Sequence, residues 1–272
     1  MPAEAVFRPQ LAVVKLGGSL LTHEADGRPG VDIASLRRLG AELASLGRPL
    51  VVLHGTGSYG KPPAARHGYM DGRLAPGRVA IGAEVTLELQ ALECAVSQAL
   101  FSSGLPVFRL PAASLFSARA GDARLVHLRP VQDLLDLGLV PLIGGGFVVD
   151  DRGLCICSSD RIATELAAAL GASSLVMATR AAGVCRDWKD PSTLHRRLCA
   201  DDHAALALIA QAPADVSGGM RTKVEEALAL AARGVRSFIV DGRLAGNVTA
   251  ALGGRPVSGT ELCAAVTPPR GT

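Results

Sequence analysis

The chain has 272 residues and a mass of 27.9 kDa, a length that suits one large domain with a substantial buried core. It is 49% hydrophobic and 19% charged, and this globular composition excludes a disordered or fibrous protein. A formal net charge of +3, without a dense basic block and with only 3% aromatic residues, predicts no nucleic-acid partner. The sequence shows no apolar run long enough for a membrane span and no secretory signal pattern at the N-terminus. We therefore expect a cytoplasmic protein without a membrane partner.

Apolar, β-branched runs alternate along the chain with helical stretches rich in Ala and Leu. This alternation predicts an α/β protein with a central, mostly parallel sheet, and no linker composition divides the chain into two domains. In chain order we expect a strand at 11–16, a helix at 32–46, a strand at 49–54, a helix at 81–101, a strand at 106–110, a helix at 130–137, a strand at 140–143, a hairpin at 147–157, a helix at 161–170, a strand at 174–178, a helix at 220–233 and a strand at 237–240.

The six cysteines contain no CxxC pair. In a cytoplasmic chain of this size we expect them to be small buried side chains, rather than members of a disulfide or a metal site. Cys155 and Cys157 are two residues apart in a strand-like run, so they are expected to share one face.

Four glycine-bearing turns follow predicted strands or precede predicted helices, which is the edge of an α/β sheet where ligands bind. Glycine lets backbone N–H groups converge on an anion, and a following helix dipole adds to the attraction. Several of these turns have a lysine nearby, and together they predict a polyphosphate site. They lie at residues 17–19, 55–61, 144–146 and 217–220.

Two familiar fingerprints overlap in the second turn, and neither is complete. Residues 55–60 match GxGxxG, but Pro62 and Pro63 follow where a dinucleotide-binding turn runs into a helix, and no acidic residue ends the next strand. Residues 55–61 match GxxxxGK, but Pro62 stands where a P-loop needs a hydroxyl for magnesium. We therefore disfavour both interpretations.

The complete pattern resembles the amino-acid-kinase superfamily, and within it the isopentenyl phosphate kinases and fosfomycin resistance kinases. The resemblance implies a three-layer αβα sandwich spanning residues 1–272, with an acceptor-binding lobe at 1–172 and a nucleotide-binding lobe at 173–272. It also implies ATP and Mg²⁺ as cofactors, a small anionic substrate and a homodimer. The motifs that carry it are Lys15-Leu16-Gly17-Gly18-Ser19, His54-Gly55-Thr56-Gly57-Ser58-Tyr59-Gly60, Val148-Val149-Asp150-Asp151, Ser158-Ser159-Asp160, Asp215-Val216-Ser217-Gly218-Gly219-Met220 with Lys223, and Asp241-Gly242 with Asn247.

The resemblance implies catalytic roles for Lys15, Lys61, Lys223 and Asp160. Phosphoryl transfer asks a protein mainly to align donor and acceptor and to neutralise phosphate oxygens, which suits the three lysines. Asp160 is expected to order the lysines around the nucleotide. The alternatives are a solvated strand-end lysine for Lys15, an exposed helix lysine paired with Glu225 or Glu226 for Lys223, and an N-cap of a helix starting at Arg161 for Asp160.

The resemblance also implies two sets of binding residues and no protein ligand for a metal. The nucleotide side comprises Gly17, Gly18, Ser19, Thr179, Gly183, Gly218, Gly219, Met220 and Lys223. The acceptor side comprises Gly55, Thr56, Gly57, Ser58, Lys61, Gly145 and Gly146.

Four positions depart from the family pattern. Lys61 stands where relatives with phosphate or phosphonate acceptors usually have histidine, and both side chains can donate to an anion. Gly146, Arg180 and Ala182 stand where the family often has carboxylates. Two sets of residues are candidates for the lining of the acceptor pocket. The apolar set is Ala80, Ile81, Ala83, Val85, Leu87, Leu115 and Phe116, and the polar set is Glu84, Glu88 and Arg109. The alternative for the apolar set, which we favour, is that its members are ordinary core residues.

The favoured function is an ATP-dependent kinase that converts a small phosphate or phosphonate to its phosphoanhydride, with isopentenyl phosphate to isopentenyl diphosphate as the preferred reaction. One alternative is a specialised-metabolite or antibiotic-resistance kinase of the fosfomycin-kinase type. Another is an inactive, nucleotide-binding regulatory relative, which the missing carboxylates suggest.

Overall fold

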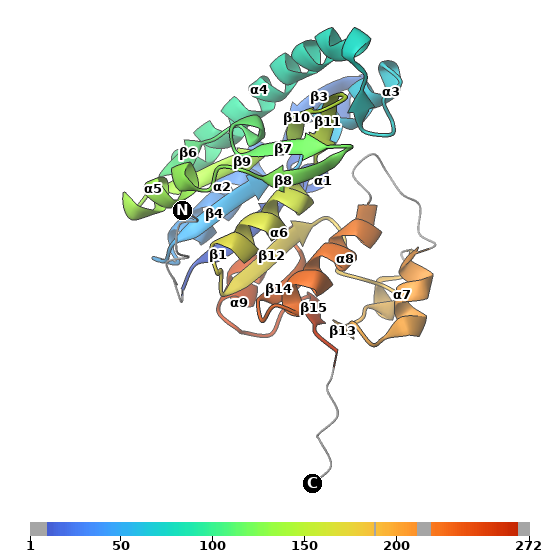
Figure 1. Ribbon diagram of the computed structural model, residues 1–272. Coiled ribbons are helices and arrows are strands. Elements are labelled where there is room, and N and C mark those ends of the chain that lie inside the picture. The colour runs from blue at the N-terminus through green and yellow to red at the C-terminus, as the bar shows by residue number, and fades with distance from the viewer. Residues whose placement is uncertain (1–9, 188, 211–218, 266–272) are drawn as a thin grey trace.

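The computed structural model describes residues 10–187, 189–210 and 219–265. Its centre is an eight-stranded sheet in which all paired neighbours are parallel, apart from the antiparallel pair β14 and β15 (Figure 1). In order across the sheet the strands are β13 (Arg197–Cys199), β15 (Gly259–Cys263), β14 (Arg236–Asp241), β12 (Ser174–Thr179), β1 (Ala12–Leu16), β4 (Leu50–His54), β9 (Val140–Gly144) and β6 (Val107–Arg109).

Helices cover both faces of this sheet. Side chains alternate along β1: Val13 packs with the helices of one face, whereas Val14 and Leu16 pack with those of the other. The first face carries α5 (Arg129–Asp136), α6 (Ser159–Ala169) and α8 (Gly219–Ala231), and α6 and α8 are seen crossing it in Figure 1. The second carries α1 (Gly18–Leu21), α2 (Ile33–Ala44), α4 (Val79–Phe101) and α9 (Asn247–Leu252). The predicted three-layer sandwich is confirmed.

Two smaller sheets stand beside the main one. The five-stranded sheet has the order β5 (Arg73–Leu74), β11 (Gly153–Cys157), β10 (Gly146–Asp150), β7 (Phe116–Arg119) and β8 (Asp122–Leu125). The other is the hairpin of β2 (Thr22–Ala25) and β3 (Arg28–Val31). The remaining elements are the short helix α3 (Lys61–Arg66), α7 (His203–Ala210) and the 3₁₀ turns η1 (Gly57–Tyr59), η2 (Pro76–Arg78), η3 (Ala112–Ser114) and η4 (Pro191–Thr193).

Every helix and strand expected from the sequence has a counterpart whose ends differ by no more than two residues. The β2–β3 hairpin was missed because its strands are short and largely exposed. The sequence feature that indicates this hairpin is the pair Asp26-Gly27. In the structure these residues have positive φ values of 51° and 69°, as a tight hairpin turn requires. The sequence suggested that Pro62 and Pro63 prevent a helix after the second glycine turn, but the short helix α3 does follow it. The two prolines occupy the first turn of α3, where the proline ring is tolerated.

The expectation for the cysteines is partly wrong. Cys199 and Cys263 are register partners in β13 and β15, and they form a disulfide. The local sequence gives no sign of it, because the sheet order alone brings the edge strand β13 next to β15. Cys155 and Cys157 are free and both buried, as expected for two residues on one face of a strand.

Strands from both sides of the proposed lobe boundary share the central sheet, since β1 pairs with β12 on one side and with β4 on the other. The boundary between residues 172 and 173 therefore stays a prediction. Within the described ranges, the helices are all too short or too polar to cross a membrane.

Candidate functional site

Loops at the carboxyl ends of four neighbouring strands line one cavity of about 430 Å³. Backbone hydrogen bonds extend from the strands into these loops: Gly17 N donates to Ala178 O at 2.8 Å, Gly55 N to Leu16 O at 2.9 Å and Gly145 N to the carbonyl of His54 at 3.1 Å. The predicted glycine turns after β1, β4 and β9 thus meet at one edge of the sheet, as the ligand-binding edge of an α/β fold does.

The first two glycine loops touch backbone to backbone. A Cβ placed on Gly18 would lie 2.2 Å from Gly57 N, and Gly57 itself has a φ of 50°. Thr22 ties the loops together, because its hydroxyl donates to Gly18 O at 2.9 Å and accepts from Ser58 N at 2.9 Å. Glycine is required here by this close approach, which no larger residue permits.

Asp160 forms ion pairs with two lysines, and all three side chains line the cavity. The alternation along β1 places Lys15 on the same face as Val13, which is the face that α6 covers. Lys15 Nζ lies 2.8 Å from Asp160 Oδ1, and Lys223 Nζ lies 3.0 Å from Asp160 Oδ2. Lys223 Nζ also donates to Gly219 O at 3.2 Å. One carboxylate therefore holds two ammonium groups from different elements at the same cavity.

The ion pairs keep Asp160 charged although it is buried. Burial raises the pKa of this carboxyl, but attraction from Lys15 and Lys223 outweighs the effect, and the pKa lies below its usual value. Lys15 is only 3% exposed, so the alternative of a solvated lysine is wrong.

The alternatives for Lys223 and Asp160 are also wrong. Lys223 pairs with Asp160, whereas Glu225 pairs with Arg221 and Glu226 with Arg161. The N-cap of α6 is Ser158, whose side chain accepts from Arg161 N at 3.2 Å, so Asp160 lies inside the first turn and is free to face the cavity.

Most residues of the predicted site line this cavity. They are Lys15, Gly17, Gly18, Ser19, Gly55, Thr56, Gly57, Ser58, Lys61, Gly145, Gly146, Asp160, Thr179 and Lys223. Gly183, Gly219 and Met220 are not among its lining residues: Gly183 packs near Leu194 and Thr260, and Met220 packs against the apolar core on the α6 and α8 face. Gly218 lies outside the described residues.

The cavity also has lining residues that the sequence did not reveal. Thr22, His23 and Glu24 come from the missed hairpin. Arg180, which the sequence had singled out as a departure from the family pattern, follows β12 and also lines the cavity. Among the described residues that line the cavity, positive charges outnumber negative ones. The cations are Lys15, Lys61, Arg180 and Lys223, and the carboxylates are Asp160 and Glu24. An anionic ligand suits this balance.

The cavity also has an apolar lining, whose side chains form one cluster. Tyr69, Val85, Leu89, Phe147 and Ile156 form it, and the rings of Tyr69 and Phe147 lie 5.4 Å apart. Of the apolar set expected for the acceptor pocket, only Val85 is a lining residue, because α4 turns Val85 and Leu89 inward and leaves Leu87 67% exposed.

The other members of the apolar set lie elsewhere. Ala80 and Ala83 are exposed, Ile81 packs beside the pocket, and Leu115 and Phe116 belong to the main core. The polar set does not line the cavity either: Glu88 and Arg109 form ion pairs with Arg66 and Glu93, and Glu84 lies 3.5 Å from His67.

The sequence pattern of the Amino acid kinase family matches residues 10–241. The chain belongs to the amino acid kinase family. It is 28% identical to an isopentenyl phosphate kinase of Methanothermobacter thermautotrophicus over 93% of this chain and 98% of that protein. A chloroplastic acetylglutamate kinase of Arabidopsis thaliana is 28% identical over 89% of this chain and 72% of that protein.

A solved structure of an isopentenyl phosphate kinase superposes with a TM-score of 0.79 and 26% identity, covering 93% of this chain and 99% of that one. The family resemblance read from the motifs is confirmed, and this family member is a phosphotransferase. Membership of this kinase family implies that ATP is the phosphoryl donor.

Proposed function

We propose that this kinase transfers the γ-phosphoryl group of ATP to a small phosphate monoester, with isopentenyl phosphate as the acceptor. The observation that carries the proposal is a single cavity lined both by cationic side chains with glycine loops and by a cluster of apolar side chains. A phosphate suits Lys61 and the glycine amides, and a short hydrocarbon chain suits the pocket of Tyr69, Val85 and Phe147.

The polar residues of the cavity have distinct proposed roles. Lys15 and Lys223, ordered by Asp160, neutralise oxygens of the transferred group, while Lys61 holds the acceptor phosphate. An oxygen of the acceptor phosphate forms a bond to the γ-phosphorus, and the bond from that phosphorus to the β,γ-bridging oxygen breaks. The electron pair of the broken bond leaves with ADP.

We propose that Mg²⁺ enters with ATP and is held mainly by phosphate oxygens and water. Residues 10–187, 189–210 and 219–265 contain no cluster of three His, Cys, Asp or Glu side chains that could hold the ion, and Asp160 is already engaged by two lysines. When bound, the ion offsets charge on the phosphates. A homodimer and a cytoplasmic location, which we also propose, rest on the family resemblance and the composition.

An assay of ADP release tests this function with isopentenyl phosphate, dimethylallyl phosphate, fosfomycin and N-acetylglutamate. We expect turnover with the prenyl phosphates and none with Lys15→Ala. Preferred turnover of fosfomycin would favour a resistance kinase. A protein that binds ATP by calorimetry but turns over no acceptor would contradict the proposal and support a regulatory relative, which the departures at Gly146, Arg180 and Ala182 first suggested.

A further inference from the structure

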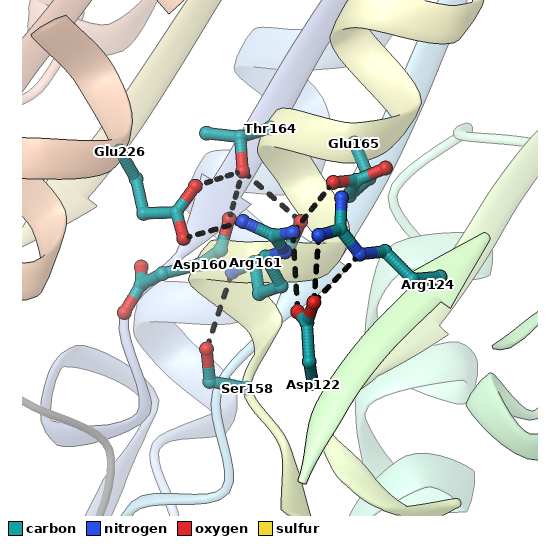
Figure 2. A network of polar contacts seen from close by, with 8 residues as sticks. All are labelled: Asp122, Arg124, Ser158, Asp160, Arg161, Thr164, Glu165 and Glu226. Atoms are coloured by element: carbon teal, nitrogen blue, oxygen red, sulfur yellow. Dashed lines mark hydrogen bonds and ion pairs between the residues drawn. The ribbon is translucent and has the colours of Figure 1, made fainter. Parts of the chain in front are cut away.

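A group of polar side chains surrounds Arg161, the residue that follows Asp160 on α6. We call Asp122, Arg161, Thr164, Glu165 and Glu226 the Arg161 cluster, and Figure 2 shows Arg161 at its centre with the Asp160 carboxylate turned away from it. The guanidinium of Arg161 lies 3.3 Å from Glu226 Oε1, 2.9 Å from Glu165 Oε1 and 3.6 Å from Asp122 Oδ1. The cluster therefore connects α6 to α8 and to β8.

Glu226 of α8 contacts two residues of α6. Its Oε2 accepts a hydrogen bond from the Thr164 hydroxyl at 2.6 Å, while its Oε1 faces Arg161. Both oxygens of one carboxylate are thus engaged by α6. The Glu226 side chain is only 18% exposed, so these contacts are less screened than those of a surface ion pair.

The helical repeat places this contact in line with the Asp160 pair. Asp160 and Thr164 are four residues apart on α6, and Lys223 and Glu226 are three apart on α8, so each helix presents both residues on one face. The interface between α6 and α8 therefore carries two polar contacts about one turn apart. The first contact is the pair of Asp160 and Lys223, which line the cavity. The second joins Glu226 to Thr164 and Arg161.

We infer that Glu226 is a positioning residue for phosphoryl transfer, and the inference rests on the proposed function. By engaging Thr164 and Arg161, Glu226 sets the rotation and axial position of α8 against α6. That placement keeps Lys223 Nζ within reach of both Asp160 and the donor phosphates. Small errors in the placement of a catalytic group lower the rate steeply, so a helix contact remote from the reacting atoms can affect kcat.

The first test compares neighbouring glutamates of α8. Glu226→Ala removes both contacts, Glu226→Gln keeps an oxygen that accepts from Thr164, and Glu225→Ala removes only the exposed pair with Arg221. With ATP and isopentenyl phosphate, we expect Glu226→Ala to lower kcat at least tenfold, with the acceptor KM changed less than twofold. Glu226→Gln should be intermediate, and Glu225→Ala should stay within twofold of the parent. Unchanged kcat in Glu226→Ala would overturn the inference.

The second test separates positioning from a general structural role. If Glu226 acts through Lys223, Glu226→Ala should not lower kcat further in a protein that already carries Lys223→Ala. A purely structural role would instead lower kcat by the same factor with or without Lys223→Ala. The same cycle is measured in the affinity for a non-hydrolysable ATP analogue by calorimetry, which needs no turnover. Equal factors in both backgrounds would overturn the inference, and Glu226→Gln replaces the alanine variant if that variant does not fold.

These outcomes are distinct from failure of the proposed function. A parent protein that binds the ATP analogue but turns over no acceptor contradicts the proposed reaction, while the affinity cycle still decides whether Glu226 positions Lys223. An active parent with an equally active Glu226→Ala variant contradicts the inference alone.

Discussion

At the scale of single residues, the site depends on one buried charge. Asp160→Asn removes the carboxylate that two lysines share, so both ammonium groups lose this compensating charge. We expect the free energy of unfolding to fall by about 3 kcal/mol at neutral pH and kinase activity to be lost. Urea denaturation and the ADP-release assay measure the two effects. The control is Asp133→Asn, which breaks the exposed pair with Arg129 and should change stability by less than about 0.5 kcal/mol.

The contribution of Asp160 to stability has a definite sign with pH. Because its folded-state pKa is lowered, the contribution is present above the unfolded pKa, and it is lost as the pH falls through the folded pKa. Full stability of Asp160→Asn at neutral pH would contradict the account.

Lys61 is the residue on which the proposed acceptor depends most directly. It lines the cavity beside the glycine loop that follows β4. Lys61→Ala should lower kcat/KM for isopentenyl phosphate more than tenfold, or about 1.4 kcal/mol of transition-state stabilisation, because a cation near the acceptor phosphate is lost. Lys61→His should keep part of the activity, since imidazole also donates hydrogen bonds. Steady-state kinetics decide between these outcomes, and an alanine variant as active as the parent would show that Lys61 does not contact the acceptor.

His54 contributes a pH dependence of the same sign, but over a higher pH range. Burial, with added repulsion from Lys15 and Arg109, lowers the pKa of His54 to about 4. A hydrogen bond with Gly55 O raises this pKa and offsets only part of the effect. Within the described part of the chain, its Nε2 has no hydrogen-bond partner. The side chain therefore stays neutral in the folded protein, while the unfolded chain takes up a proton below about pH 6.5.

This difference should destabilise the parent as the pH falls from about 6.5 to about 4, by up to about 3 kcal/mol. His54→Gln lacks the titrating group, so its stability should fall less over that range. Urea denaturation at several pH values compares the two proteins, and parallel curves would contradict a neutral buried imidazole.

At the scale of elements, the contact between α1 and η1 holds the first two glycine loops together. In Gly18→Ala, the new methyl group would lie 2.2 Å from Gly57 N, so the loops must separate. We expect a loss of about 1–3 kcal/mol in stability and a large fall in kcat/KM, because the phosphate-facing amides move apart. Gly77→Ala is the matched control, since its added methyl group meets open space. Equal activity of the two variants would show that the close approach is dispensable.

The same scale shows which elements a sequence reveals. Long helices and buried strands such as α4 and β12 have strong apolar patterns and appear where expected. The hairpin β2–β3 and the edge strand β13 do not, because short or exposed strands are stabilised by their partners more than by their own side chains. The missed hairpin matters for function, since Thr22, His23 and Glu24 line the cavity.

At the scale of the whole molecule, the Cys199–Cys263 disulfide closes a long loop that contains α7, α8 and β14. Neither cysteine lines the cavity. Reduction, or Cys263→Ser, should lower the free energy of unfolding by up to about 4 kcal/mol while kcat stays within twofold. Denaturation with and without a reductant measures this effect, and Cys94→Ser, at an exposed free cysteine, is the control. Unchanged stability after verified reduction would contradict a stabilising bridge.

The sequence by itself determined the alternation of strands and helices, the glycine turns at strand ends and the family, because periodicity and turn chemistry are local properties. It also indicated that Lys15, Asp160 and Lys223 belong to one site, but only through their place in the family motifs. Tertiary structure decided how they meet, since the packing of α6 against β1 and α8 brings both ammonium groups within 3.0 Å of the Asp160 carboxylate. Tertiary structure also decided the apolar lining of the cavity, the disulfide and the Arg161 cluster, because each joins segments that lie far apart in the sequence.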